Sequence, residues 1–259
     1  MKMATVLEVT EYLDERVPFA TTLDFDNVGR LCGEPQREVK KVLCALDITD
    51  EVIGEASDMG ADLIVSHHPL IFHPLKSVRS DDLVGRKIMT MARRNISGIC
   101  MHTNLDAAVG GVNDALITAL GVRNGRPLGG EGAMSRIGTL PESVDFADFL
   151  ESTKKALGAY GLRYVDAGRK IFTVGCCGGS GGDFIEEALA AGCDVFVTAD
   201  VRHDRFLAAK EYGISLIDGG HFSTENVVMP VLRQLVLDGF PELEVTISRR
   251  NGQPEHFYM

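Results

Sequence analysis

The chain has 259 residues, of which 45% are hydrophobic and 24% are charged. This composition is typical of a folded protein, and the length allows one large domain or two modest ones. The formal net charge of −11 argues against a general nucleic-acid binder, because such proteins present basic surfaces to phosphate groups.

No apolar stretch approaches the roughly 20 residues that span a bilayer. The first residues, MKMATVLEVTEYLDERV, carry acids where a signal peptide needs an apolar core. We therefore expect a cytoplasmic protein that does not enter a membrane. The six cysteines show no C-x-x-C spacing, and we expect them to be buried free thiols.

Short runs rich in valine, isoleucine and leucine alternate with segments of helical period, which predicts an α/β fold. Glycines and a proline in VRNGRPLGGEGAMSRIG (122–138) predict a loop or linker between two halves, 1–125 and 126–259. Strands are expected at residues 41–47, 62–66, 96–101, 170–176, 194–198, 214–218 and 243–248. Helices are expected at residues 51–59, 83–94, 111–120, 145–157, 183–191, 203–212 and 225–238.

The two halves share a repeated segment. DEVIGEASDMGADLIVSH (50–67) aligns without a gap on GDFIEEALAAGCDVFVTA (182–199), and six positions are identical at an offset of 132 residues. Two unrelated helix–turn–strand units can share common residues, since a glycine between helix and strand is expected in any of them. We favour a duplication, which would bring the corresponding strand ends together in one cleft.

A histidine pair follows the apolar run DLIVS. In a continuing strand, His67 and His68 would point to opposite faces of the sheet, so the strand must end there if they share a site. Pro69 favours a turn or extended conformation at His68. The imidazoles of two adjacent residues diverge, so His67 and His68 suit two metal ions about 3.5–4 Å apart better than one ion. A hydrogen-bonded pair of histidines at a strand end is the structural alternative.

Two more strand ends deliver residues of the kind that bind metals. The run GICM leads into His102 and Asp106, and SLID leads into His221 and Glu225, which a helix would place on one face. Ser223 and Thr224 are possible N-caps, in which case the helix begins only there, and Asp106 has an alternative role in a turn or cap. Ligands in open α/β sheets bind beyond the carboxyl ends of the strands. We therefore predict a metal site made by His67, His68, Asp106, His221 and Glu225.

The donors of this predicted site are three imidazoles and two carboxylates. Such a set suits divalent Zn, Mn, Fe, Co or Ni and does not choose among them. His102 is a candidate general acid or base, or a partner that orients Asp106, and we favour the second role.

The segment GCCGGSGGD (175–183) holds five glycines between a strand and a helix. Its backbone N–H groups could cradle an anion. It lacks the Gly-Lys-Ser/Thr ending of a nucleotide-binding P-loop. A tight strand–helix turn is the alternative and the interpretation that we prefer.

Several long motifs resemble one known family. They are FDNVGRLCG (25–33), SHHPLIFHPLKSV (66–78), HTNLDAAVGGVND (102–114), SRIG (135–138) and DGGHFSTE (218–225). In this order they resemble the Nif-three-like family, whose members are often called GTP cyclohydrolase I type 2 homologues.

The resemblance implies a duplicated three-layer α/β/α fold with mixed sheets, two divalent metal ions and a ring-shaped homohexamer. It implies that one ion takes His67 and the other takes His68 and His221, with Glu225 and Asp106 shared or bridging. The halves would then interlock around one site.

Two such ions would make water a good nucleophile near neutral pH and polarise the bond under attack. We therefore predict a dinuclear metal-dependent hydrolase of a small, nucleotide-like substrate. The alternative is a metal-binding adaptor or metal-handling protein without catalysis. A nucleic-acid partner is disfavoured by the acidic charge balance.

Overall fold

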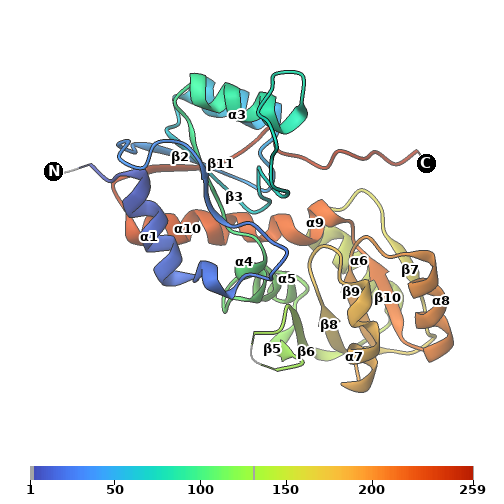
Figure 1. Ribbon diagram of the computed structural model, residues 1–259. Coiled ribbons are helices and arrows are strands. Elements are labelled where there is room, and N and C mark those ends of the chain that lie inside the picture. Colours follow the sequence, from blue (N-terminus) through green and yellow to red (C-terminus); the bar gives the residue numbers. More distant parts are fainter. Residues whose placement is uncertain (1–2, 131, 259) are drawn as a thin grey trace. The chain divides into compact units, whose positions relative to one another are not determined.

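The computed structural model describes residues 3–130 and 132–258. The chain forms two compact units (Figure 1). Residues 3–105 with 229–252 form the first, and residues 106–228 with 253–258 form the second. The predicted halves, 1–125 and 126–259, follow the repeat in the sequence, and that division stays a prediction.

The first unit contains a five-stranded mixed sheet in the order β1-β4-β3-β2-β11. Strands β2, β3, β4 and β11 pair in parallel, and the edge strand β1 is antiparallel to β4. The central strands are buried along their length because helices cover both faces of the sheet. The strands are β1 (Gly29–Cys32), β2 (Lys41–Ala45), β3 (Leu63–Ser66), β4 (Ser97–Cys100) and β11 (Glu244–Ile247).

Helices form the outer layers of the first unit. Helices α1 (Val6–Arg16) and α10 (Met229–Gly239) contact each other, and α10 packs on β2 and β11. Helices α2 (Asp50–Met59) and α3 (Leu83–Arg93) contact each other and share an apolar cluster with β2 and β3. Figure 1 shows α3 on one side of these strands and α1 with α10 on the other, which completes three layers. A single turn of 3-10 helix, Phe19–Thr21, precedes β1.

The second unit contains a six-stranded mixed sheet in the order β5-β6-β8-β9-β10-β7. Successive side chains of a strand point to opposite faces of the sheet, and β9 shows this alternation. Val195 and Val197 pack with residues of α5 and α6, and Phe196 packs with residues of α7 and α8 on the other face. The strands are β5 (Arg123–Leu128), β6 (Ser135–Val144), β7 (Arg163–Val165), β8 (Ile171–Cys176), β9 (Val195–Thr198) and β10 (Ser215–Asp218). The helices are α5 (Val112–Ala119), α6 (Phe146–Leu157), α7 (Ile185–Ala190), α8 (His203–Tyr212) and α9 (His221–Glu225), with 3-10 turns at Gly182–Phe184 and Asn226–Val228.

The two sheets repeat one topology. The order β1-β4-β3-β2 in the first corresponds to β7-β10-β9-β8 in the second, with the same parallel and antiparallel pairings. Asp62 and Asp194, 132 residues apart, make the same hydrogen bonds: one carboxylate oxygen of Asp62 accepts the N–H groups of Lys40 and Lys41, and one of Asp194 accepts those of Phe172 and Thr173. The predicted duplicated α/β fold with mixed sheets is confirmed.

All seven predicted strands are present, with ends that differ by two residues or fewer. The helix predicted at 225–238 instead begins at Met229, after α9 and a 3-10 turn. Pro230 explains the later start, because proline has no N–H to donate and fits only the first turn of a helix.

The prediction of a loop or linker at 122–138 is wrong, because β5 and the first part of β6 form an antiparallel hairpin there. Glu131 of that segment lies outside the described residues. Strand β5 is an edge strand with mostly exposed side chains, so it lacks the apolar alternation that would reveal it in the sequence. Among the described residues, no helix combines the length and apolar character needed to cross a membrane.

None of the six cysteines forms a disulfide, and five of them are buried thiols as predicted, whereas Cys32 is half-buried. Burial raises the pKa of the Cys44 thiol to about 12 and that of Cys193 to about 12. These thiols therefore stay protonated at neutral pH and act as small apolar side chains.

Candidate metal centre

The histidine pair follows the carboxyl end of β3, which ends at Ser66 as predicted. The backbone N–H of His67 donates to the carbonyl of Ala45 (3.2 Å), and that of His68 donates to the carbonyl of Leu46 (2.8 Å). The Ser66 hydroxyl closes the turn by donating to the carbonyl of His68 at 2.8 Å. The two imidazole rings therefore lie together, with centroids 4.9 Å apart and planes at 47°.

His102 joins the pair from the neighbouring strand. Strands β3 and β4 are parallel with Ser66 opposite Cys100, so the residues that follow them meet at one edge of the sheet. The His102 ring centroid lies 5.2 Å from that of His67 and 5.4 Å from that of His68. One ring nitrogen from each histidine lies within 4.8 Å of the other two. His67 is fully buried, and the side chains of His68 and His102 are 22% and 16% exposed.

Each imidazole of this cluster has a hydrogen-bond acceptor at Nδ1. An acceptor there fixes the neutral tautomer with the proton on Nδ1, so that Nε2 carries the lone pair. Histidine ligands of metals are held in this way. The acceptors, each at 2.8 Å, are the carbonyl of Met101 for His67, a carboxylate oxygen of Asp47 for His68 and a carboxylate oxygen of Asp26 for His102.

Asp26 is the most firmly held of these acceptors. Its side chain has no exposed surface, and its second oxygen accepts hydrogen bonds from the N–H (3.1 Å) and hydroxyl (2.6 Å) of Thr103. Although burial alone would raise the pKa of Asp26, the hydrogen bonds from His102 and Thr103 hold it well below its ordinary value. Burial, followed by the neighbouring His67, lowers the pKa of His102 below 6.5 despite the Asp26 carboxylate. At neutral pH, His102 is therefore a neutral imidazole beside an ionised carboxylate. Orientation of Asp106 by His102 stays a prediction.

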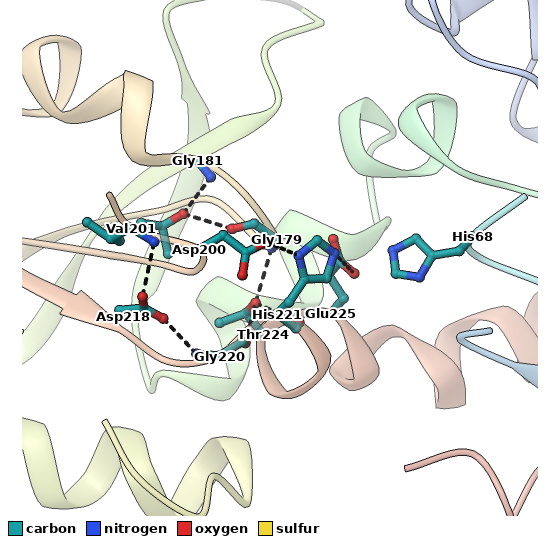
Figure 2. A network of polar contacts seen from close by, with 12 residues as sticks. His68, Gly179, Gly181, Asp200, Val201, Asp218, Gly220, His221, Thr224 and Glu225 are labelled. Carbon is teal, nitrogen blue, oxygen red and sulfur yellow. Dashed lines mark hydrogen bonds and ion pairs between the residues drawn. The ribbon is translucent and has the colours of Figure 1, made fainter. Parts of the chain in front are cut away.

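A second set of predicted ligands lies in the second unit, beyond the end of β10. Helix α9 begins at His221, with Gly220 as its N-cap residue, so a helix start at Ser223 or Thr224 is wrong. His221 and Glu225 consequently lie one turn apart on one face, with His221 Nε2 3.1 Å from a Glu225 carboxylate oxygen. His221 Nδ1 lies 2.7 Å from an oxygen of Asp200. Figure 2 shows Asp200 and Glu225 on opposite sides of the His221 ring.

Two carboxylates, those of Glu225 and Asp200, surround the His221 imidazole. Burial lowers the pKa of His221, but the hydrogen bonds and charges of Glu225 and then Asp200 outweigh it and raise the pKa to about 9. In the metal-free protein, a proton on His221 therefore balances the carboxylate charge. A divalent cation between the same donors would replace that proton.

Asp106 completes the second set. It lies in the short helix α4 (Thr103–Ala107), is 5% exposed and has an oxygen within 4.8 Å of one of Glu225. Arg136, from the predicted SRIG motif, is 1% exposed and fixes the end of α4 by donating to the carbonyls of Ala107 (3.1 Å) and Ala108 (3.0 Å). The same guanidinium forms an ion pair with Asp114.

The glycine-rich segment 175–183 forms a tight turn that packs against α9. The N–H of Gly178 donates to the Asn113 side chain (2.7 Å), and that of Gly179 donates to the Thr224 hydroxyl (3.1 Å). The N–H of Gly181 donates to the hydroxyl of Thr198 (2.9 Å). Since protein acceptors already use these N–H groups, the segment is a turn and not an anion cradle. Gly179 has φ +61°, and a Cβ there would lie 2.2 Å from a Glu225 carboxylate oxygen.

The sequence patterns did not reveal the three acids that hold His68, His102 and His221. Asp26 lies within the quoted motif FDNVGRLCG, and Asp47 follows the end of β2. Asp200 could have been predicted as a site residue from the internal repeat, because the offset of 132 residues aligns it with His68. The repeat thus carries an acid in the second half where the first carries a histidine.

The donor chemistry fits divalent transition metals, because imidazole nitrogens and carboxylate oxygens are their usual protein ligands. The structure brings together His67, His68 and His102 in the first unit. In the second unit it brings together His221, Glu225 and Asp106.

These observations define a class of protein: a duplicated α/β fold whose strand ends carry histidine and carboxylate groups of the kind that hold metal ions. The family model that matches the chain is Duf34/NIF3 (NGG1p interacting factor 3), over residues 4–254. The chain belongs to this family.

A curated relative from Clostridium perfringens, called GTP cyclohydrolase 1 type 2 homolog, is 33% identical over 99% of this chain and 100% of its own length. A crystal structure of a hypothetical protein from Staphylococcus aureus has a TM-score of 0.94 at 29% identity, covering 99% of this chain and 100% of that one. A Bacillus cereus protein related to NIF3, 23% identical with a TM-score of 0.92 and full coverage of both chains, shares the fold.

Proposed function

We propose that the protein is a hydrolase that depends on two divalent metal ions and acts on a small, nucleotide-like substrate. The observation that carries this proposal is the cluster of His67, His68 and His102, whose imidazoles all have an acceptor at Nδ1. Histidine ligands of metals are usually oriented by such an acceptor, which leaves the Nε2 lone pair directed towards the cluster. The relatives named GTP cyclohydrolase 1 type 2 homolog support a nucleotide as the substrate class.

We assign His67, His68, Asp106, His221 and Glu225 as the residues that would hold the two ions. Chain connectivity supports a joint role for both sets, because His102 of the first unit immediately precedes the short helix that carries Asp106 of the second.

Bound divalent cations supply Lewis acidity and make water acidic enough to act as a nucleophile near neutral pH. The residues of the chain then have distinct tasks. Asp47 and Asp200 orient the imidazoles of His68 and His221. His102 stays neutral beside ionised Asp26, so its Nε2 is able to accept a proton during hydrolysis.

The deciding experiment uses protein purified without chelator. Its metal content is measured by mass spectrometry, and GTP, cyclic amides and phosphoesters are offered as substrates. We expect two metal equivalents and turnover of at least one substrate class. In His68→Ala, loss of metal should accompany a fall in turnover of roughly 100-fold or more. His203→Ala is the matched control, since His203 is exposed at the start of α8.

Metal binding without turnover of any substrate in that panel would count against the hydrolase and favour a metal-handling protein. The proposal also includes a homohexamer and a cytoplasmic location. Light scattering of the purified, metal-loaded protein tests the first, and cell fractionation tests the second.

A further inference from the structure

Two exposed phenylalanines lie beside the histidine cluster in the first unit. Phe25 is 64% exposed and Phe72 is 37% exposed. Their ring centroids are 6.2 Å apart, with planes at 58°, and Phe72 lies 6.2 Å from the His102 ring at 78°. His73 packs its ring edge-on against Phe72 at 4.8 Å. An aromatic surface thus adjoins the imidazoles that are candidates for metal binding.

The segments that carry these rings are tied together by hydrogen bonds. The side-chain amide of Asn27 donates to the carbonyl of Ile71 at 2.6 Å, which connects the segment of Phe25 to that of Phe72. The N–H of Leu23 donates to the hydroxyl of Thr103 at 3.0 Å. Phe25 therefore lies between anchored neighbours, and its exposure does not come from an unattached loop.

The hydrogen bonds on either side of Phe25 lead directly to the cluster. Asp26, the next residue, accepts from His102 and Thr103. The Thr22 hydroxyl donates to the same carboxylate at 2.9 Å. One short segment thus fixes the orientation of His102 and presents an aromatic ring to solvent. A ligand that stacks on the ring would be positioned relative to the imidazole by the same backbone.

An exposed, anchored aromatic pair is suited to stacking. Aromatic rings prefer offset or edge-to-face contacts with centroids about 4.5–7 Å apart, and flat bases of any kind stack on phenylalanine. A molecule on this surface would lie next to His102, and hence within the proposed active site. This position favours the flat ring of a substrate over a protein partner as the occupant.

We propose that Phe25 and Phe72 form a stacking platform for a flat heteroaromatic ring, such as a nucleobase, and thereby select ring-bearing substrates for the metal centre. This inference rests on the proposed function and names the part of the substrate that the protein recognises. Phe25 and Phe72 are specificity-determining residues, because they position the substrate and leave the chemistry to the imidazoles and carboxylates.

The test measures equilibrium binding of GTP, ATP, CTP and UTP to the metal-loaded protein, with inorganic triphosphate as the probe that lacks a ring. We expect at least one nucleotide to bind about tenfold or more tightly than triphosphate. Phe25→Leu and Phe72→Leu should each remove most of that preference, while the affinity for triphosphate and the metal content stay the same. Phe172→Leu is the matched control, since Phe172 on β8 is also exposed, at 42%.

Absence of a ring preference in the wild type for all four nucleotides would overturn the platform. An unchanged preference in both variants would overturn it as well. A change in oligomeric state in Phe25→Leu, measured by light scattering, would also overturn the platform, because the surface would then be a protein interface.

The outcome is separable from that of the hydrolase proposal. If a ring preference is lost in the variants although no nucleotide is hydrolysed, the platform holds and the proposed reaction fails. If a nucleotide is hydrolysed, the platform predicts a KM about tenfold higher in the variants with little change in kcat. Hydrolysis with an unchanged KM would reject the platform and leave the hydrolase in place.

Discussion

Asp26 and His102 are 76 residues apart in the chain, yet a carboxylate oxygen of Asp26 lies 2.8 Å from His102 Nδ1. This contact holds one imidazole of the candidate metal centre in a single tautomer and also connects the centre to the exposed Phe25. It provides the first testable prediction.

Replacement of Asp26 by alanine should weaken metal binding by roughly 10- to 100-fold, the usual effect of removing an outer acceptor at a metal centre, because His102 packs against the rings of His67 and His68. The reason is that His102 would lose its orienting acceptor, and the N–H of Thr103 would lose its acceptor as well. Competition with a chromogenic chelator measures the affinity. The control is Asp24→Ala, an exposed acid two residues away. Equal affinities of the two variants would show that Asp26 does not support the centre.

Replacement of Gly179 by alanine should displace the Glu225 carboxylate and reduce metal occupancy. A Cβ at Gly179 would lie 2.2 Å from a Glu225 oxygen, and φ of +61° adds strain for any residue with a side chain. Gly168→Ala is a close control, because Gly168 has φ +71° with no atom within 4 Å of an added Cβ. Both variants should lose about 1–2 kcal/mol of stability to backbone strain, and only Gly179→Ala should lose metal as well. Metal analysis and urea denaturation measure the two effects separately.

The stability of the metal-free protein should depend on the protonation of His221. Its pKa is raised from 6.5 to about 9 in the folded state, so the folded protein binds this proton more tightly than the unfolded chain does. The stabilisation is complete below about pH 6.5 and is lost as the pH rises through about 9. Relative to His221→Gln, the Tm of the chelator-treated wild type should therefore fall over this interval. Parallel Tm profiles of the two proteins from pH 6 to 10 would contradict the assignment.

Metal affinity should rise as the pH rises towards about 9, whereas the stability of the metal-free protein falls over the same interval. A cation requires the neutral imidazole of His221, so binding below about pH 9 releases the proton that this residue holds. Calorimetry in buffers of different ionisation enthalpy counts the released protons. We expect about one proton fewer for His221→Gln than for the wild type at pH 7.5.

Replacement of Arg136 by methionine should destabilise the protein by about 2 kcal/mol or more, because a buried guanidinium and its hydrogen bonds to backbone carbonyls would be lost. Arg136 is 1% exposed, and its loss would leave the carbonyls of Ala107 and Ala108 without this donor. Arg202→Met is the control, because the ion pairs of Arg202 with Asp183 and Asp204 are exposed and exposed pairs contribute about 0–1 kcal/mol. Similar urea midpoints for the two variants would show that Arg136 does not hold α4 in place.

Local patterns in the sequence predicted the buried strands well. Val, Ile and Leu runs revealed β2, β3 and β4 and their counterparts β8, β9 and β10, because a strand covered on both faces must be apolar along its length. Of the four edge strands, β11 was predicted, but β1, β5 and β7 carry no such signal. An edge strand forms because a neighbour offers unpaired backbone groups, and its own side chains need not be apolar.

The candidate ligands were likewise visible where local rules apply. His67 and His68 had to leave the sheet together because adjacent side chains in a strand diverge, and β3 ends just before them. The spacing of His221 and Glu225 matched one helical turn, which α9 provides. The helix start was wrong because Gly220 takes the N-cap position without any side-chain cap.

By itself, the sequence determined the alternation of strands and helices, the internal repeat, and which strand ends carry imidazoles and carboxylates. These features follow from side-chain periodicity and chain order, which act over a few residues. Only the tertiary structure decided which acceptor holds each imidazole. Asp26 and His102, like Asp200 and His221, meet because separate loops converge beyond the carboxyl ends of a sheet, and no local pattern encodes a contact between segments that folding alone brings together.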